Sequence, residues 1–383
     1  MIEKKEAPSN IAVSEEAKNQ EQNKSTNFIE KLKAEIYSKT MNLNAIDTLP
    51  NINTGLFTIQ SANSWIEQAK SRPIPKMLFS EFWYEREVCI LFSDTNLGKS
   101  ILAVQIANSI SKGIPINGFK LEASKQSVLY FDFELTEKQF QNRYSVDYDK
   151  AYQFDSNLLR VEINPDSEIP IGQTFEEYLY DSLEALIIER KTKILVIDNL
   201  TYLRTETEKA KDALPLMKEL KHLKNKYNLS LLILAHTPKR DLSKPITRND
   251  LQGSKMLINF CDSSFALGES STDKCVRYIK MIKARNTEII YDSENVCVCN
   301  INKPSNFLQF EFLDFGSESD HLKVVSEKEK EELEGRIAEL IEKEPGISAY
   351  AIAKKLCKNE NKFNSFKVKV SRIYNKLCPK TVQ

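Results

Sequence analysis

The sequence predicts an α/β fold with a central, mostly parallel sheet, followed by a small all-α unit. Short, near-continuous apolar runs alternate with segments of helical period from about Leu56 to Phe315. Strands that are apolar along their whole length are typical of a parallel sheet with helices on both faces. After about residue 332 the apolar residues recur at helical spacing, which predicts helices.

These runs define the order of the expected elements. Strands are expected at Val88–Phe92, Val128–Phe133, Leu159–Ile163, Ile194–Ile197, Leu231–Leu234 and Ser264–Leu267. Helices are expected between them at 99–111, 136–146, 174–190 and 207–227. Three further strands have no helix between them and are expected to be antiparallel at an edge of the sheet: Val276–Lys283, Asn295–Ile301 and Phe307–Phe312.

The composition is that of a globular protein: of 383 residues, 41% are hydrophobic and 28% are charged, and the net charge is zero. No apolar run is long enough to span a membrane, and the first residues, MIEKKEAPSN, lack the apolar core of a secretory signal. Several of the seven cysteines lie inside apolar runs, which fits a reducing cytoplasm. Cys297 and Cys299 alternate on an expected strand, but the chain has only three histidines, so we expect no zinc site.

The segment from Glu87 to Ile110 carries the most specific signal. An apolar strand leads into a polar turn, then Gly98-Lys99-Ser100 and a helical pattern, which is the arrangement of a phosphate-binding P-loop. Backbone N–H groups of such a loop surround a phosphate chain, the lysine contacts the β- and γ-phosphates, and the serine holds Mg²⁺. The sequence therefore predicts ATP and Mg²⁺ as ligands. The expected nucleotide-binding residues are Ser93, Asp94, Thr95, Asn96, Leu97, Gly98, Lys99, Ser100 and Ile101.

One position departs from the P-loop pattern. Ser93 stands where the pattern has glycine, which is favoured because it adopts unusual backbone angles at no steric cost. The effect of this serine on nucleotide affinity is left open. An ordinary turn between a strand and a helix that contains Gly-Lys-Ser is the alternative interpretation.

A second nucleotide motif ends the strand Ile194–Ile197. The strand leads into Asp198, the pattern of a Walker B strand, which places Asp198 at the sheet edge where ligands bind and predicts that it orders Mg²⁺. The next residue is Asn199, whereas many P-loop enzymes place a water-activating glutamate there. The base must therefore come from another strand.

Glu134 is the expected base. It lies at the tip of the strand VLYFDFE, which follows the P-loop helix. Asp132 lies two residues earlier, and so on the same side of the strand but deeper. A charge that complements the N-terminus of the next helix is the alternative role for Glu134.

Two further polar sites follow buried strands. Leu231–Leu234 continues to His236, which is expected to contact the γ-phosphate and to sense its loss. The next loop, TPKRDLSKPITRND, carries cations that can contact nucleic-acid phosphates or face solvent. Lys283 and Arg285 lie on one face at the end of a later strand and are expected to stabilise a γ-phosphate bound by the adjacent subunit, unless they are simply a surface strand end.

This order of motifs resembles RecA-like ATPases of the RepA and DnaB hexameric helicase kind. The likeness is greatest to RepA-like AAA-family ATPases of bacterial plasmids and mobile elements, and it covers roughly residues 56–315. It implies a homo-oligomer in the form of a hexameric ring, ATP at subunit interfaces, and movement on or remodelling of DNA. The resemblance implies that Lys99 and Ser100 bind phosphate and Mg²⁺, Glu134 polarises water, Asp198 orders Mg²⁺, His236 senses γ-phosphate, and Lys283 and Arg285 act in trans.

The C-terminal unit is basic. From Gly346 to Gln383 the chain has eight lysines and one arginine against one glutamate. Three helices with a short turn before a basic third helix resemble a helix-turn-helix or winged-helix module. Asn364 is expected to cap the third helix. A basic, solvated helical cap is the alternative, but the preferred interpretation is a DNA-binding face formed by Lys369, Arg372 and Lys376.

The expected domains are a disordered N-terminal arm at 1–45, a RecA-like ATPase domain at 46–320 and a helix-turn-helix-like DNA-binding domain at 321–383. The arm is polar and cannot bury enough apolar surface to order itself. It also carries Ile29, Leu32 and Ile36 at helical spacing, which predicts a short amphipathic helix that packs on its own domain or on a neighbouring subunit.

The preferred functional hypothesis is an ATP-hydrolysing motor on DNA, a RepA-like replicative helicase of a mobile element. The second is a DNA-binding regulator or loader that uses ATP to switch its assembly without unwinding DNA. The third is a RecA-like ATPase that acts on protein, in signalling or timekeeping, and the basic C-terminal unit argues against it.

Overall fold

The computed structural model describes residues 30, 31, 33, 52–199, 213–238, 240–251, 254–323, 327–357 and 363–378. The residues on which the expected N-terminal helix depends, Ile29, Leu32 and Ile36, lie outside this set, as does Lys239 of the loop after His236. The contacts divide the chain into two units between Ile74 and Pro75.

The first unit contains a hairpin and a helix. β1 (Ile52–Thr54) pairs with β2 (Phe57–Ile59) in an antiparallel hairpin around Gly55, whose φ of 57° lies in the left-handed region that glycine adopts readily. α2 (Ala62–Lys70) follows, and none of its nine residues is buried. Its apolar side chains, such as Trp65, are therefore largely exposed in the structure.

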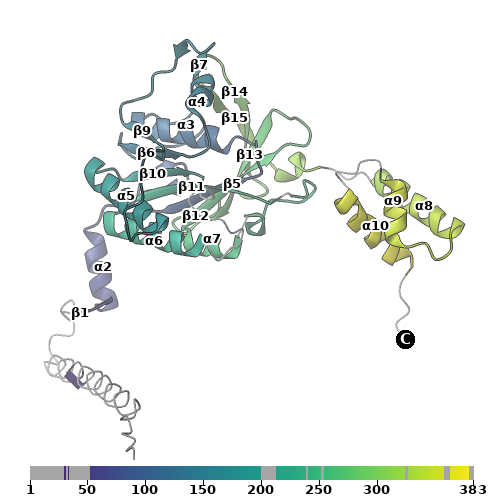
Figure 1. Ribbon diagram of the computed structural model, residues 1–383, viewed down its shortest axis with the longest axis horizontal. Coiled ribbons are helices and arrows are strands. Elements are labelled where there is room, and N and C mark those ends of the chain that lie inside the picture. The colour runs from purple at the N-terminus through teal and green to yellow at the C-terminus, as the bar shows by residue number, and fades with distance from the viewer. Residues whose placement is uncertain are drawn as a thin grey trace, which may run out of the picture. The chain divides into compact units, whose positions relative to one another are not determined.

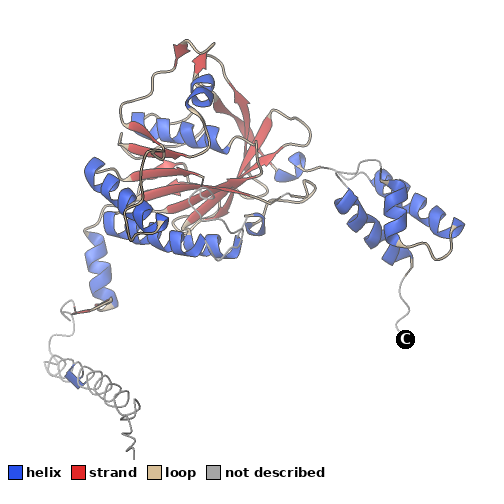
Figure 2. Ribbon diagram, in the orientation of Figure 1, coloured by secondary structure: helices blue, strands red, loops and turns tan. Residues whose placement is uncertain are grey.

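The second unit is built on a sheet of nine strands (Figures 1 and 2). The strands are β5 (Val88–Ser93), β6 (Val128–Asp132), β9 (Leu158–Val161), β10 (Ile194–Asp198), β11 (Ser230–His236), β12 (Ser263–Glu269), β13 (Val276–Lys283), β14 (Val296–Asn302) and β15 (Gln309–Gly316). Their order is β15-β14-β13-β12-β5-β11-β10-β6-β9. The strands from β12 to β9 in this order run parallel, and the other three pair antiparallel. The expected α/β fold with a mostly parallel sheet is confirmed.

Helices cover both faces of this sheet, with α3 and α4 on one face and α5, α6 and α7 on the other (Figure 2). They are α3 (Lys99–Lys112), α4 (Glu137–Arg143), α5 (Phe175–Arg190), α6 (Ala213–Tyr227) and α7 (Ser254–Phe260). Successive strand residues point into two separate hydrophobic cores, one on each face of the sheet. Leu91 of β5 belongs to the same core as Leu102 of α3, and Ile90 of β5 belongs to the same core as Leu183 of α5. Burial on both faces is the reason that these strands are apolar throughout.

The helices begin in two different ways, and the difference bears on function. Thr136 and Thr174 form capping boxes at the starts of α4 and α5, so side chains bind N–H groups of the first turn. α3 begins at Gly98 without a side-chain cap. Its first N–H groups therefore point toward whatever lies in front of the helix.

Several expected boundaries are wrong. The helix expected at 136–146 ends at Arg143, and β7 (Ser145–Val146) pairs with β8 (Lys150–Ala151), because Asp147 and Tyr148 adopt left-handed backbone and turn the chain. The strand expected at Phe307–Phe312 is β15, which begins two residues later and continues to Gly316. The helix expected from residue 207 is described from Ala213 onward, and the other ends agree within two residues. Besides β7 and β8, the elements that the sequence analysis did not predict are β1, β2, α2, β3 (Met77–Phe79), β4 (Trp83–Tyr84), α7, η2 (Arg248–Asp250) and η3 (Glu318–His321).

The C-terminal residues form a small helical unit with its own core. Its helices are α8 (Glu327–Lys343), α9 (Ala349–Leu356) and α10 (Phe363–Leu377). Ile337, Ile352 and Val370, one from each helix, are fully buried together. The described residues of this unit contain helices but no strand, so the expected all-α unit is confirmed. α10 begins one residue before Asn364, so the expected cap at that position is wrong.

Candidate functional site

The turn between β5 and α3 adopts left-handed backbone at two positions. Gly98 has a φ of 96° and Asn96 a φ of 61°, whereas Ser93 belongs to the extended strand β5. A Cβ at Gly98 would also lie 2.8 Å from Ile301 Cδ1, so the end of the Ile301 side chain would have to shift. The loop therefore requires glycine at Gly98 and accommodates a serine at Ser93.

Lys99 folds back into this loop. Its Nζ donates to Ser93 O at 3.1 Å, to Ser93 Oγ at 3.2 Å and to Asp94 O at 2.9 Å. Burial lowers the pKa of Lys99 to about 8, while the negative charge of Asp198 opposes this shift. A phosphate oxygen offers the ammonium group a charged acceptor, which makes a stronger hydrogen bond than a carbonyl oxygen does.

Asp198 ends β10 beside the start of α3. Tyr130 donates its hydroxyl to Asp198 Oδ2 at 2.7 Å, and the Ser100 hydroxyl also bonds to this carboxyl group. Burial raises the pKa of Asp198 to about 6. Sequence reasoning missed Tyr130. Its place in the strand VLYFD, two residues before the buried Asp132 and on the same side, is the signal that could have found it.

These residues fit a magnesium ion. Ser100 and Asp198 supply a hydroxyl and a carboxylate, the hard oxygen donors that Mg²⁺ prefers, and Mg²⁺ usually takes few protein ligands when phosphates supply the others. The raised pKa of Asp198 shows that its negative charge lacks compensation in the protein alone. A bound Mg²⁺ would supply that compensation and would neutralise charge on the β- and γ-phosphates.

Glu134 and His236 meet at the same edge of the sheet, and Asn199 lies between them. His236 Nε2 is 3.3 Å from Glu134 Oε1 and 2.9 Å from Asn199 Nδ2, and Asn199 Nδ2 also donates to Glu134 Oε1. The hydrogen bond with His236 lowers the pKa of Glu134, which keeps its carboxylate ionised and able to accept a proton. Asn199 was not among the expected functional residues. Its position directly after Asp198, where many P-loop enzymes have the water-activating glutamate, is the signal that could have found it.

Asp132, the deeper acidic residue of β6, is occupied by contacts within the fold. Its Oδ2 accepts a hydrogen bond from Arg160 Nε at 2.9 Å, and its Oδ1 accepts from the backbone N–H groups of Glu134 and Leu135 at 3.2 and 3.0 Å. The residue is only 2% exposed. Glu134 is therefore the better candidate for a base that contacts water.

Lys283 and Arg285 lie at the edge of the sheet opposite to the P-loop of the same subunit, because β13 runs antiparallel to β12. Lys283 Nζ donates to Ile258 O and Cys261 O at 2.5 and 2.7 Å, next to the C-terminus of α7. Arg285 pairs with Asp262 at 3.0 Å. Both cations thus stabilise a helix end within the subunit. Their action on the nucleotide of an adjacent subunit stays a prediction.

The three expected DNA-binding residues share α10 and are exposed. Lys376 pairs with Glu334 of α8 at 2.7 Å, so part of its charge is compensated within the unit. Lys369 and Arg372 are in none of the ion pairs found among the described residues. These two residues are therefore the stronger candidates for phosphate contacts.

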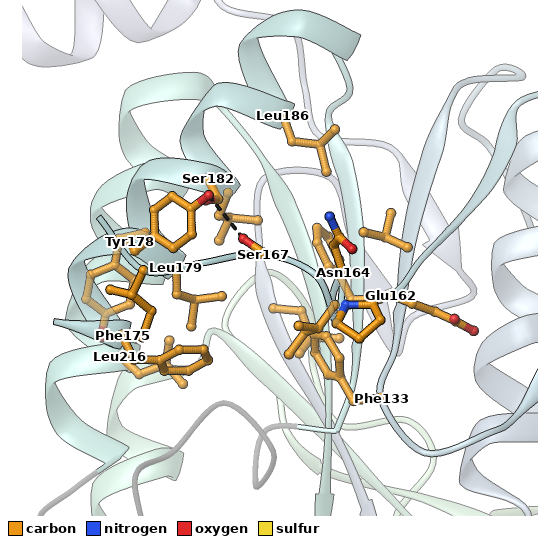
Figure 3. Close-up of a pocket in the computed structure, with 18 residues that line it drawn as sticks. Phe133, Glu162, Asn164, Ser167, Phe175, Tyr178, Leu179, Ser182, Leu186 and Leu216 are labelled. Atoms are coloured by element: carbon orange, nitrogen blue, oxygen red, sulfur yellow. Dashed lines mark hydrogen bonds between the residues drawn. The ribbon is translucent and has the colours of Figure 1, made fainter. Parts of the chain in front are cut away.

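A separate cavity of about 570 Å³ lies between α5 and the β6–β9 end of the sheet (Figure 3). Phe175 and Tyr178 of α5 line one side of it and Phe133 lines the other. The hydroxyl groups of Ser167 and Tyr178 are 3.2 Å apart. No described residue of the P-loop lines this cavity, so it is distinct from the candidate phosphate site.

No group of three or more histidine, cysteine, aspartate or glutamate side chains among the described residues is placed to hold a metal ion. No helix in the same residues has the length and apolar character needed to cross a bilayer.

One comparison with known proteins bears on this site. Residues 58–241 match the family model described as an AAA domain. A KaiC-like protein from the hyperthermophilic archaeon Pyrococcus horikoshii OT3 is similar in structure, with 13% sequence identity, a TM-score of 0.40, and coverage of 60% of this chain and 91% of that chain. None of the curated proteins matches the sequence. The AAA-domain match and the geometry of the P-loop together support a P-loop ATPase.

Proposed function

We propose that residues 46–320 bind and hydrolyse ATP. The observation that carries this proposal is the meeting of Lys99, Asp198 and Glu134 at one edge of the sheet, where α3 presents uncapped N–H groups. The match of residues 58–241 to an AAA domain supports the same activity.

Each side chain has a defined task in this reaction. Lys99 and the loop N–H groups hold the phosphates, and Ser100 and Asp198 would hold Mg²⁺. Glu134 accepts a proton from water while the water oxygen bonds to the γ-phosphorus and the bond to the bridging oxygen breaks, so that ADP and phosphate leave. Positive charge and N–H donors around the γ-phosphate stabilise the charge that develops on its oxygens.

We further propose that this ATPase is a motor on DNA, a RepA-like replicative helicase of a mobile element that works as a hexameric ring. Exposed Lys369 and Arg372 support contact with DNA phosphates. The position of Lys283 and Arg285, remote from the P-loop of their own subunit, supports a role in trans at a subunit interface.

The alternative is an ATP-switched regulator or loader that binds DNA without unwinding it. The observation in its favour is the C-terminal unit itself. Three short helices around one core are typical of modules that dock on duplex DNA, and such docking requires no strand separation.

The experiment that tests the proposal measures ATPase rate and particle size with and without single-stranded and duplex DNA. The motor hypothesis predicts DNA-stimulated hydrolysis, a ring-sized particle and strand displacement on a forked substrate. DNA-stimulated hydrolysis without strand displacement favours the alternative. If the wild-type protein hydrolyses ATP no faster than Lys99→Ala does, both the motor hypothesis and the alternative are wrong.

A further inference from the structure

Asn199 occupies an unusual place between the two residues that face the expected γ-phosphate. It is 5% exposed and follows Asp198 directly. Its Nδ2 lies within hydrogen-bond reach of both Glu134 Oε1 and His236 Nε2. A single amide group thus joins the candidate base to the candidate phosphate sensor.

The chemistry of the amide fixes the direction of these bonds. An ionised carboxylate only accepts hydrogen bonds, so the amide must present its NH₂ group to Glu134. His236 Nε2 lies 3.3 Å from the same Glu134 oxygen, and His236 Nδ1 is buried with no hydrogen-bond partner among the described residues. A hydrogen on Nε2 has the carboxylate as its acceptor, whereas a hydrogen on Nδ1 would have none. Asn199 and His236 therefore both donate to Glu134 Oε1.

We propose that Asn199 is a positioning residue that donates an N–H to Glu134 Oε1, next to the N–H that His236 Nε2 donates to the same oxygen, and so holds the carboxylate in a single arrangement. The inference rests on the proposed ATP hydrolysis for its kinetic consequence.

The consequence concerns the other carboxylate oxygen. The hydrogen bonds that the described residues make to the Glu134 carboxylate all involve Oε1, and 38% of this side chain is exposed. Fixing Oε1 leaves Oε2 outside these hydrogen bonds, so this oxygen can take the proton of the attacking water. Lys99 and Asp198 are the other charged groups near this carboxylate, and neither replaces the amide bridge.

A kinetic experiment tests the consequence. Loss of the amide donors in Asn199→Asp should lower kcat about 100-fold while KM for ATP changes about twofold or less, because a misdirected base affects the chemical step and not binding. Asn199→Gln retains an NH₂ group and should restore part of kcat. Asn157→Asp, the same change at the opposite edge of the sheet, is the matched control and should leave kcat unchanged.

The outcomes separate this inference from the proposed function. If the wild-type protein does not hydrolyse ATP, or Glu134→Gln hydrolyses it normally, the proposed function or its base is wrong. If wild type is active, Glu134→Gln is inactive, and Asn199→Asp matches Asn157→Asp in kcat, only the positioning role is wrong. A parallel rise in KM and fall in stability in all Asn199 variants assigns the residue a purely structural role.

Discussion

Lys280 Nζ lies 2.5 Å from Glu318 Oε2, and both side chains are almost completely buried. The same two side chains bind one backbone segment from both sides, since Glu318 Oε1 accepts from Ile246 N at 2.6 Å and Lys280 Nζ donates to Ile246 O at 2.8 Å. This ion pair anchors the loop that begins directly after His236 to β13 and η3. The segment that follows the candidate phosphate sensor is therefore held by a buried charge pair.

Breaking this pair should destabilise the protein strongly. Glu318→Gln leaves the ammonium group of Lys280 buried without a charged partner, which costs about 3–5 kcal/mol of the free energy of unfolding. Urea unfolding measures the loss, and hydrogen exchange should become faster at 240–251. Glu339→Gln removes the partner of Lys343 in a fully exposed pair and should change the free energy of unfolding little. Equal losses in the two variants would contradict the assigned role of the buried pair.

Replacement of the candidate base should separate binding from turnover. Glu134→Gln removes the proton acceptor but leaves the loop and Lys99 intact, so ATP affinity should stay within about threefold while kcat falls by about 10²–10⁴. Binding of a labelled ATP analogue and the steady-state phosphate release rate measure the two effects. Asp132→Asn is a comparison at the deeper acidic position, where a loss of stability is expected through the broken contact with Arg160. Wild-type turnover in Glu134→Gln would remove the base assignment.

The burial of Asp198 predicts a dependence of stability on pH. Because burial raises its pKa from 3.8 to about 6, the folded state binds the proton more tightly than the unfolded state. Protonation of Asp198 therefore contributes about 3 kcal/mol to the free energy of unfolding. This contribution is fully present below pH 3.8 and is lost as the pH rises through about 6. In metal-free buffer, Asp198→Asn should therefore be more stable than wild type at pH 8, and thermal unfolding should show the difference shrinking toward pH 4. If wild type and Asp198→Asn unfold at the same temperature at pH 8, the folded site already compensates the negative charge of Asp198.

The basic face of α10 predicts a graded loss of DNA binding. Lys369→Ala and Arg372→Ala should each weaken binding and reduce the dependence of log K on log salt by about one unit, as expected for the loss of a single phosphate contact. Lys376→Ala should have a smaller effect, because Glu334 already compensates its charge. Lys343→Ala, an exposed change on α8, is the matched control. Fluorescence anisotropy at several salt concentrations measures the slopes, and equal slopes in all four variants would assign the DNA contacts to another surface.

The sequence predicted the long elements better than the short connections. The strands of the parallel sheet were predictable because they are buried on both faces and are apolar throughout. β7 and β8 were not, since two residues per strand carry no periodic pattern. Their turn also depends on left-handed backbone at Asp147 and at Tyr148, and tyrosine is not a typical turn residue. Asn199 and Tyr130 were missed because their partners are more than thirty residues away in the chain.

Local sequence by itself determined that a strand, a glycine turn and a helix would form a phosphate-binding loop, because the hydrophobic period and the conformational freedom of glycine act over a few residues. Only the tertiary structure decided which polar groups meet there. The parallel register of β6, β10 and β11 brings Glu134, Asn199 and His236 to the same edge, and burial in that packed interior sets the pKa of Asp198 and of Lys99. These effects depend on distance and solvent exclusion between residues far apart in the chain, so no local pattern encodes them.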